Sequence, residues 1–252
     1  MLRSLCVFIA LAGCGQEPGK PSKPAELPDM PAFKESGAKI SFLNRNIWLD
    51  LNDKGRRVIL RTTVCRRDVP LEEFMCLKGT KEHEAIVTAD IVPKVFHAAL
   101  IAAGAEPGTP AKYEGDKFEP ARGHKLEITV EWKEQGKAKR AKAQDWLREI
   151  QSKKSTSYDF VFAGSQEVKN PVTGETYYLG NEGDLISVAN FASSIVDIAV
   201  RSSDVDADHM FEAFKERIPE VDTEVYVILK PVAEKKGTTP TDKAPAESGN
   251  KK

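Results

Sequence analysis

The sequence predicts an α+β domain of mostly antiparallel strands with two or three short helices, flanked by disordered tails. Three observations support this fold class. Stretches in which apolar and polar residues alternate outnumber stretches with helical periodicity. The segments joining them are short, as in hairpins, whereas a doubly wound parallel sheet needs long crossovers. Segments 15–35 and 234–252 are rich in Pro, Lys and small polar residues and nearly free of large apolar ones.

The expected strands are apolar or alternating runs bounded by turn-forming residues. The clearest spans 125–133, where Leu126, Ile128, Val130 and Trp132 share a face, and residues 134–137 turn it back. A first hairpin is expected over 47–51 and 57–65, because the intervening Asn-Asp-Lys-Gly favours a turn. The other expected strands are 84–91, 158–163, 176–179, 185–191, 195–200 and 225–229.

Three short helices are expected. The clearest spans 93–103, because Pro93 suits a first helical turn, Gly104 suits the C-cap and the apolar residues between them have helical spacing. The others are 145–150 and 208–217.

The N-terminus predicts export and lipid anchoring. The apolar run 5–12 is too short to span a bilayer, which takes about 20 residues, and follows a short basic start, as in a signal peptide. It ends in Leu-Ala-Gly-Cys at 11–14, which resembles the bacterial lipobox at all four positions. The resemblance implies that residues 1–13 are removed and that Cys14 carries the lipid. The body is then expected on the periplasmic or extracellular side of a bacterial envelope membrane.

The rest of the chain divides into three parts. Residues 14–35, with the lipidated Cys14 and five prolines, are expected to form an extended linker. Residues 36–233 form a single domain, and 234–252 a disordered tail. Apart from Phe33, neither flanking segment holds core-sized apolar residues in a pattern, so trimming 15–35 and 234–252 is expected to leave the thermal midpoint nearly unchanged.

The charge balance argues against a nucleic-acid partner. Lys and Arg number 37 and Asp and Glu 38, so no basic excess is available to neutralise phosphates. No further apolar run could span a membrane, so the expected membrane contact is the lipid at Cys14. A protein or small-molecule partner remains open.

Five stretches of the body resemble one known family. They read L-E-E-F-M-C at 71–76, K-E-H-E-A at 81–85, F-H-A-A-L-I-A-A-G-A-E-P-G at 96–108, V-F-A-G-S at 161–165 and G-D-L-I-S-V-A-N-F at 183–191. Together they are similar to the YdjY-like domain of exported bacterial proteins. Some relatives carry a ferredoxin-like label, but a four-iron cluster takes four thiolates and only Cys65 and Cys76 lie in the body of this chain. The resemblance implies no particular activity.

Cys65 and Cys76 are the first candidates for chemistry. In an exported protein two such cysteines indicate a disulfide, worth about 3 kcal/mol for so short a loop in the chain-entropy model. The alternatives are two free buried thiols, or a zinc site in which His83, with His97 or a glutamate, joins both cysteines. The spacing matches no standard ligand pattern, so the sequence predicts no cofactor, with zinc as the alternative.

The histidines and two partial motifs have simpler interpretations. His83 is expected on a strand face, half-buried and opposite Glu82 and Glu84, while His97 is expected at the edge of a helix face. Ser165 follows Ala163-Gly164 but lacks the flanking glycines of a nucleophile elbow. The acidic run at 204–208 lacks the glycine and glutamate that a calcium loop requires.

Two classes of function follow. The favoured one is an envelope-anchored lipoprotein with a non-catalytic domain that binds a ligand or partner, because no nucleophile motif or phosphate-binding loop is recognisable. The alternative is a metal-binding or enzymatic domain that uses Cys65, Cys76 and His83.

Overall fold

The computed structural model describes residues 27–35, 37–53, 55–114, 117–202 and 209–233. The helices are Pro31–Lys34 (α1) and Pro93–Ala102 (α2). The strands are Ile40–Asn44 (β1), Ile47–Asp50 (β2), Arg57–Val64 (β3), Glu73–Leu77 (β4), Ala85–Ala89 (β5), Lys112–Glu114 (β6), Lys117–Glu119 (β7), Lys125–Glu134 (β8), Lys137–Lys142 (β9), Leu147–Glu149 (β10), Phe160–Phe162 (β11), Glu167–Lys169 (β12), Thr176–Tyr178 (β13), Asp184–Ser187 (β14), Val196–Ile198 (β15), Phe211–Ala213 (β16) and Glu224–Pro231 (β17).

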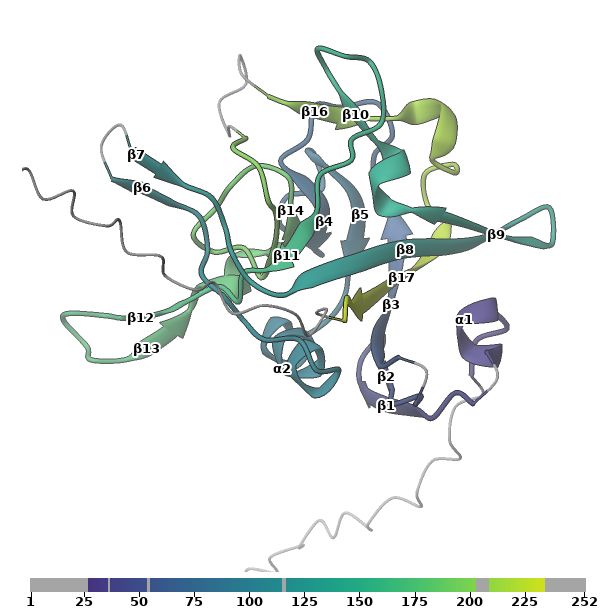
Figure 1. The fold of residues 1–252 in the computed structure, drawn as a ribbon, viewed down its shortest axis with the longest axis horizontal. Helices are drawn as coiled ribbons and strands as arrows, with labels where there is room; N and C mark the ends of the chain where they lie inside the picture. The colour runs from purple at the N-terminus through teal and green to yellow at the C-terminus, as the bar shows by residue number, and fades with distance from the viewer. Residues whose placement is uncertain (1–26, 36, 54, 115–116, 203–208, 234–252) are drawn as a thin grey trace, which may run out of the picture.

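Eight of these strands close into a β-barrel, so the predicted α+β class is wrong. Their order is β3-β17-β8-β11-β15-β14-β4-β5, and pairing of β5 with β3 completes the circle (Figure 1). Most pairs are antiparallel, as expected, but β4–β5 and β14–β15 are parallel. Strands make up 42% of the structure and helices 13%, too little helix to form a separate layer.

Closure of the barrel follows from strands that are apolar on both faces. In register, Leu60 of β3, Val227 of β17 and Val130 of β8 lie side by side and face the barrel core. The next residues along two of these strands, Ile59 and Ile228, are also buried, but in a second cluster on the outer face. These strands are buried on both faces, whereas the strands of an amphipathic sheet bury only one face.

Aromatic side chains fill the barrel. Phe74 of β4 lies between Trp146 and Phe160, at ring-centroid distances of 6.2 and 6.4 Å. Trp146 packs edge-on against Trp132 at 5.4 Å. Trp146 comes from the short 3-10 helix Ala143–Trp146, where a longer helix over 145–150 was expected. That helix is replaced by β10, because Leu147 continues into the interior in an extended conformation.

The expected helix at 208–217 is also wrong. Residue 208 lies outside the described part, and 211–213 form β16, which pairs with β10. Phe211 and Ala213 are buried while Glu212 points outward to Arg148, which is the two-residue period of a strand. The helix at 93–103 is confirmed as α2, whose Phe96 and Leu100 join the barrel core.

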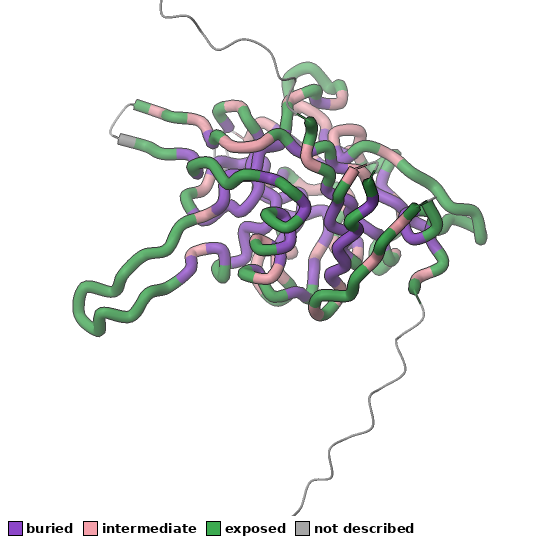
Figure 2. Tube along the Cα trace, turned by 60° about the horizontal axis from the view of Figure 1, so that its bottom comes forward, coloured by how far each residue is buried: buried purple, intermediate pink, exposed green. Residues whose placement is uncertain are grey.

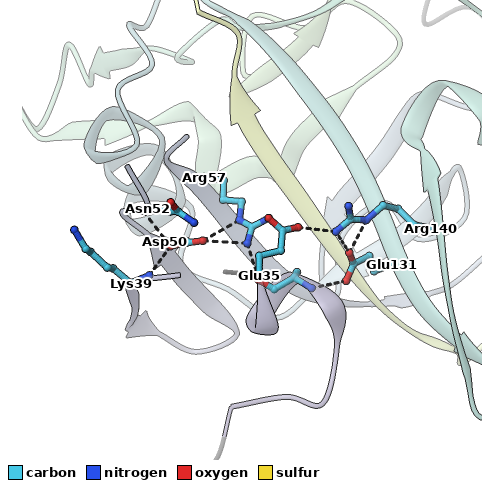
Figure 3. A network of polar contacts seen from close by, with 8 residues as sticks. Glu35, Lys39, Asp50, Asn52, Arg57, Glu131 and Arg140 are labelled. Carbon is cyan, nitrogen blue, oxygen red and sulfur yellow. Dashed lines mark hydrogen bonds and ion pairs between the residues drawn. The ribbon is translucent and has the colours of Figure 1, made fainter. Parts of the chain in front are cut away.

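The end of the expected linker packs against the barrel. Phe33 of α1 makes edge-to-face contacts with Trp48 and Tyr226, at 5.2 and 5.5 Å. Around it lies a network of hydrogen bonds and ion pairs shown in Figure 3, formed by Glu35, Lys39, Asp50, Asn52, Arg57, Glu131 and Arg140. Residues 30–35 are therefore part of the folded body.

Two hairpins, β6–β7 and β12–β13, project on the same side of the barrel (Figure 1). Figure 2 shows that their outer parts are exposed while the barrel strands are buried. Residues 170–174 form the tip of the second hairpin, whose first strand is β12 and not the barrel strand β11. Neither α-helix of the described residues has the length and apolar character needed to cross a membrane.

Candidate functional site

A pocket of about 350 Å³ lies where the β12–β13 hairpin meets α2. Helix α2 supplies Lys94 and His97, and Tyr178 comes from the end of β13. The rest of the wall is residues 164–166, between β11 and β12, and Glu167 at the start of β12. Proline at the start of α2 fixes the helix entry and thereby the direction in which Lys94 and His97 leave the helix.

The backbone turn after β11 shapes the pocket wall. Gly164 has φ +91°, and Ser165 follows with φ +56°, a left-handed conformation that is uncommon for residues other than glycine. A β-carbon at Gly164 would come within 2.8 Å of Pro107, so the position also needs glycine for space. Such strained residues cluster at functional sites, where the surrounding structure holds them in place.

His97 is held at the pocket wall by Tyr178. The Tyr178 hydroxyl lies 2.8 Å from Nδ1, and the ring also interacts with the backbone of Gly164. Burial lowers the pKa of His97, which favours the neutral ring. Its edge also packs against Phe162, with ring centroids 5.0 Å apart.

Tyr178 is the aromatic wall of the pocket. Burial raises its pKa to about 12, so the phenol keeps its proton. The Ser165 hydroxyl interacts with the same phenol, but its geometry is too poor for a hydrogen bond. Burial favours the neutral forms of both His97 and Tyr178, which hydrogen-bond to each other at the wall of the pocket.

The mouth of the pocket carries an exposed ion pair. The Lys94 ammonium lies 3.3 Å from the Glu167 carboxylate and 5.6 Å from the centre of the Tyr178 ring. More than half of each charged side chain is exposed, so the pair is worth at most about 1 kcal/mol and can separate at low cost. A second hollow of about 430 Å³ lies beside Gln166, which lines both spaces, and its far wall is the start of the β6–β7 hairpin.

The structure places the cysteines on either side of β5 without a disulfide between them. Cys65 follows β3 and bonds through its backbone to Ile86, while Cys76 pairs with Thr88 from the opposite side. The two thiols contact each other: a hydrogen bond from Cys76 lowers the pKa of Cys65, and the same contact raises the pKa of Cys76. The disulfide remains a prediction.

The histidines do not join the cysteines. His83 is exposed in the turn before β5 and lies 3.5 Å from Glu84, so its expected place on a half-buried strand face, away from Glu84, is wrong. His97 lies in the Tyr178 pocket. Within the described ranges, no three or more His, Cys, Asp or Glu side chains gather as metal ligands would. The acidic run at 204–208 and Cys14 lie outside those ranges.

Sequence reasoning found His97 but missed its partners. Tyr178, Lys94 and Gln166 stand in stretches without any motif, and only the fold brings them together. The available signal was Gly164-Ser165 at the end of an apolar strand, which indicates a sharp turn whether or not an enzyme motif is complete.

Fold and pocket together define the class of protein: a closed eight-stranded β-barrel domain with a hairpin-flanked pocket on its side. The chain belongs to the YdjY domain family, whose family model matches residues 49–230, from β2 to β17. This confirms the resemblance found in the sequence; α1 and β1 lie before the matched region. No curated protein and no solved structure matches the chain significantly.

Proposed function

We propose that this chain is an exported bacterial lipoprotein whose barrel binds a ligand or partner group in the Tyr178 pocket without chemically changing it. The observation that carries the proposal is the pocket beside His97, whose Nδ1 hydrogen-bonds to the Tyr178 hydroxyl. An accessible hollow with an aromatic wall and a few polar groups is the usual form of a binding site. The metal or enzymatic alternative finds no support, because the described residues do not bring His83 to the cysteines.

The pocket suits a group with an apolar body and an anionic end. The Tyr178 ring offers a flat apolar surface, and Lys94 stands over it with an ammonium that pairs with the exposed carboxylate of Glu167. An incoming carboxylate can replace Glu167 on Lys94 at little cost, because exposed ion pairs are weak. The ligand class we propose is therefore a carboxylate attached to an apolar or aromatic group.

Cross-linking from the pocket tests this function. A photo-reactive amino acid in place of Gln166 should give discrete adducts in living cells, whereas the same group at exposed Lys154 should give none above background. Lys94→Glu should reduce the Gln166 adduct at least tenfold, since it removes the cation and adds repulsion. Lys154→Glu, the same charge change away from the pocket, should leave it intact. Absence of adducts at Gln166 would refute pocket binding, and equal adducts in both charge variants would refute recognition of an anion.

Lipid anchoring is tested separately. Cys14→Ser should leave the precursor unprocessed and move it from the detergent phase to the aqueous phase on phase separation, because the thiol that would carry the lipid is gone. Mass spectrometry should find added acyl mass on the wild-type protein and none on the variant. Identical partitioning of the two proteins, with no added mass on the wild type, would show that the protein is not a lipoprotein.

A further inference from the structure

Remote from the Tyr178 pocket, polar side chains are buried against the outer face of the barrel. Glu73 of β4 and Ser187 of β14 are neighbours in register, and Asp197 of β15 follows on the next strand. All three are fully buried, and the connection 188–195 adds Ser193 and Ser194. Three of the stretches singled out in the sequence, 71–76, 81–85 and 183–191, meet here.

Lys81 enters this cluster from the turn between β4 and β5. Its ammonium lies 3.1 Å from Oδ1 of Asp184, 3.3 Å from Oε2 of Glu72 and 3.8 Å from the centre of the Phe191 ring. Only 26% of the Lys81 side chain is exposed, and 3% of that of Asp184. The amine is thus held against one buried carboxyl group, with an aromatic ring restricting access of water.

The Asp184 carboxyl group is fixed from the other side. Ser193 donates a hydrogen bond to its Oδ2, which leaves Oδ1 for Lys81. The Glu73 carboxyl group interacts with that of Asp184 and accepts a hydrogen bond from Ser187, at 3.0 and 3.1 Å to its two oxygens. Burial, together with the charge of Asp184, raises the pKa of Glu73 well above its usual range. This direction favours the protonated, neutral form of Glu73 beside Asp184.

We propose that Lys81 and Asp184 join in an intramolecular amide bond, with Glu73 as the catalytic acid. The Lys81 ammonium first passes a proton to the Asp184 carboxylate. The free amine attacks Cγ of Asp184 while Glu73 donates a proton to the carbonyl oxygen, which gives a tetrahedral intermediate. A C–O bond then breaks, one oxygen leaves as water, the amine loses its second proton and Glu73 recovers its own. In balance, one ammonium and one carboxylate become one amide and one water, with no oxidant or cofactor.

Two physical effects favour this reaction in the folded chain. Strands β4, β5 and β14 hold the amine and the carboxyl group in contact, so the two groups need not first diffuse together. Such positioning raises a reaction rate by several orders of magnitude. The product also replaces two charges at a largely buried site with a neutral amide, which removes a desolvation penalty. Burial opposes the charge on Lys81, but the Asp184 carboxylate raises its pKa overall, so the free amine forms only by proton transfer within the cluster. The reaction is therefore a slow, single event after folding.

Intact-mass measurement of the full chain tests the proposal. The wild-type protein should be lighter than its sequence by one water, and a protease digest should contain a branched peptide joining Lys81 to Asp184. Lys81→Arg keeps the charge but cannot form the bond under these conditions, so its mass should be complete. Glu73→Gln should also retain the water, or lose it far more slowly, because glutamine is no acid.

Asp184→Asn provides a control in which the amide bond should still form. Its amide should lose ammonia instead of water and give a final mass identical to that of the matured wild-type chain. A wild-type chain of complete mass after long incubation at neutral pH would overturn the proposal. So would a water loss that persists in Lys81→Arg, since this would point to ring closure of an aspartate on its own backbone. Circular dichroism of each variant shows whether it has folded.

Discussion

Replacing Arg57 by alanine is expected to lower the free energy of unfolding by about 3–5 kcal/mol, the usual cost of leaving a buried charge without its partner. Arg57 is almost fully buried on the outer face of β3 and binds Asp50, which has no exposed surface, at 3.0 Å. It also binds Glu35 at 2.7 Å and donates to the Ala32 carbonyl at 2.7 Å. The variant therefore leaves the buried Asp50 carboxylate without its cationic partner. It also removes the contacts of Arg57 with Ala32 of α1 and with Glu35.

A neighbour on the same strand provides the control. Arg61 also pairs with a carboxylate, that of Glu224, but about half of each side chain is exposed. Such a pair contributes at most about 1 kcal/mol, so Arg61→Ala should change stability little. Equilibrium unfolding in denaturant measures both variants. Equal losses would mean that the difference in burial between the two ion pairs has no energetic consequence.

Sequence reasoning found most barrel strands but could not find the barrel. Alternation at 125–133 identifies β8 and its buried face, and the turn residues at 52–55 identify the β2–β3 hairpin. Closure depends on pairing β5 with β3 and on the parallel pair β14–β15. Alternation tells which side of a strand is buried and not which strand lies next to it, so these pairings left no local signal.

The same limit applies to the sites. His97 could be placed on a helix from its spacing, but Tyr178 lies far along the chain and reaches it only because the end of β13 lies beside α2. Lys81 and Asp184 are even farther apart in sequence and meet across β4. The helices expected at 145–150 and 208–217 failed for a related reason: pairing between β10 and β16 overrides a weak local preference.

Removing residues 1–35 is expected to lower the thermal midpoint by about 6–12 °C, whereas removing residues 1–26 should change it little. The structure thus alters the expectation that the whole segment to residue 35 is dispensable. Residues 27–35 carry Phe33, which fills the space between Trp48 and Tyr226, and the backbone N–H of Ala32, which donates to fully buried Glu131 at 2.9 Å. Loss of an aromatic side chain from such a cluster costs about 3 kcal/mol or more, and each kcal/mol shifts the midpoint by about 2–4 °C in a domain of this size.

Calorimetry of the two truncated chains, with Phe33→Ala in the full chain as a third sample, measures the effect. Equal midpoints for the two truncations would show that α1 adds nothing to the stability of the barrel.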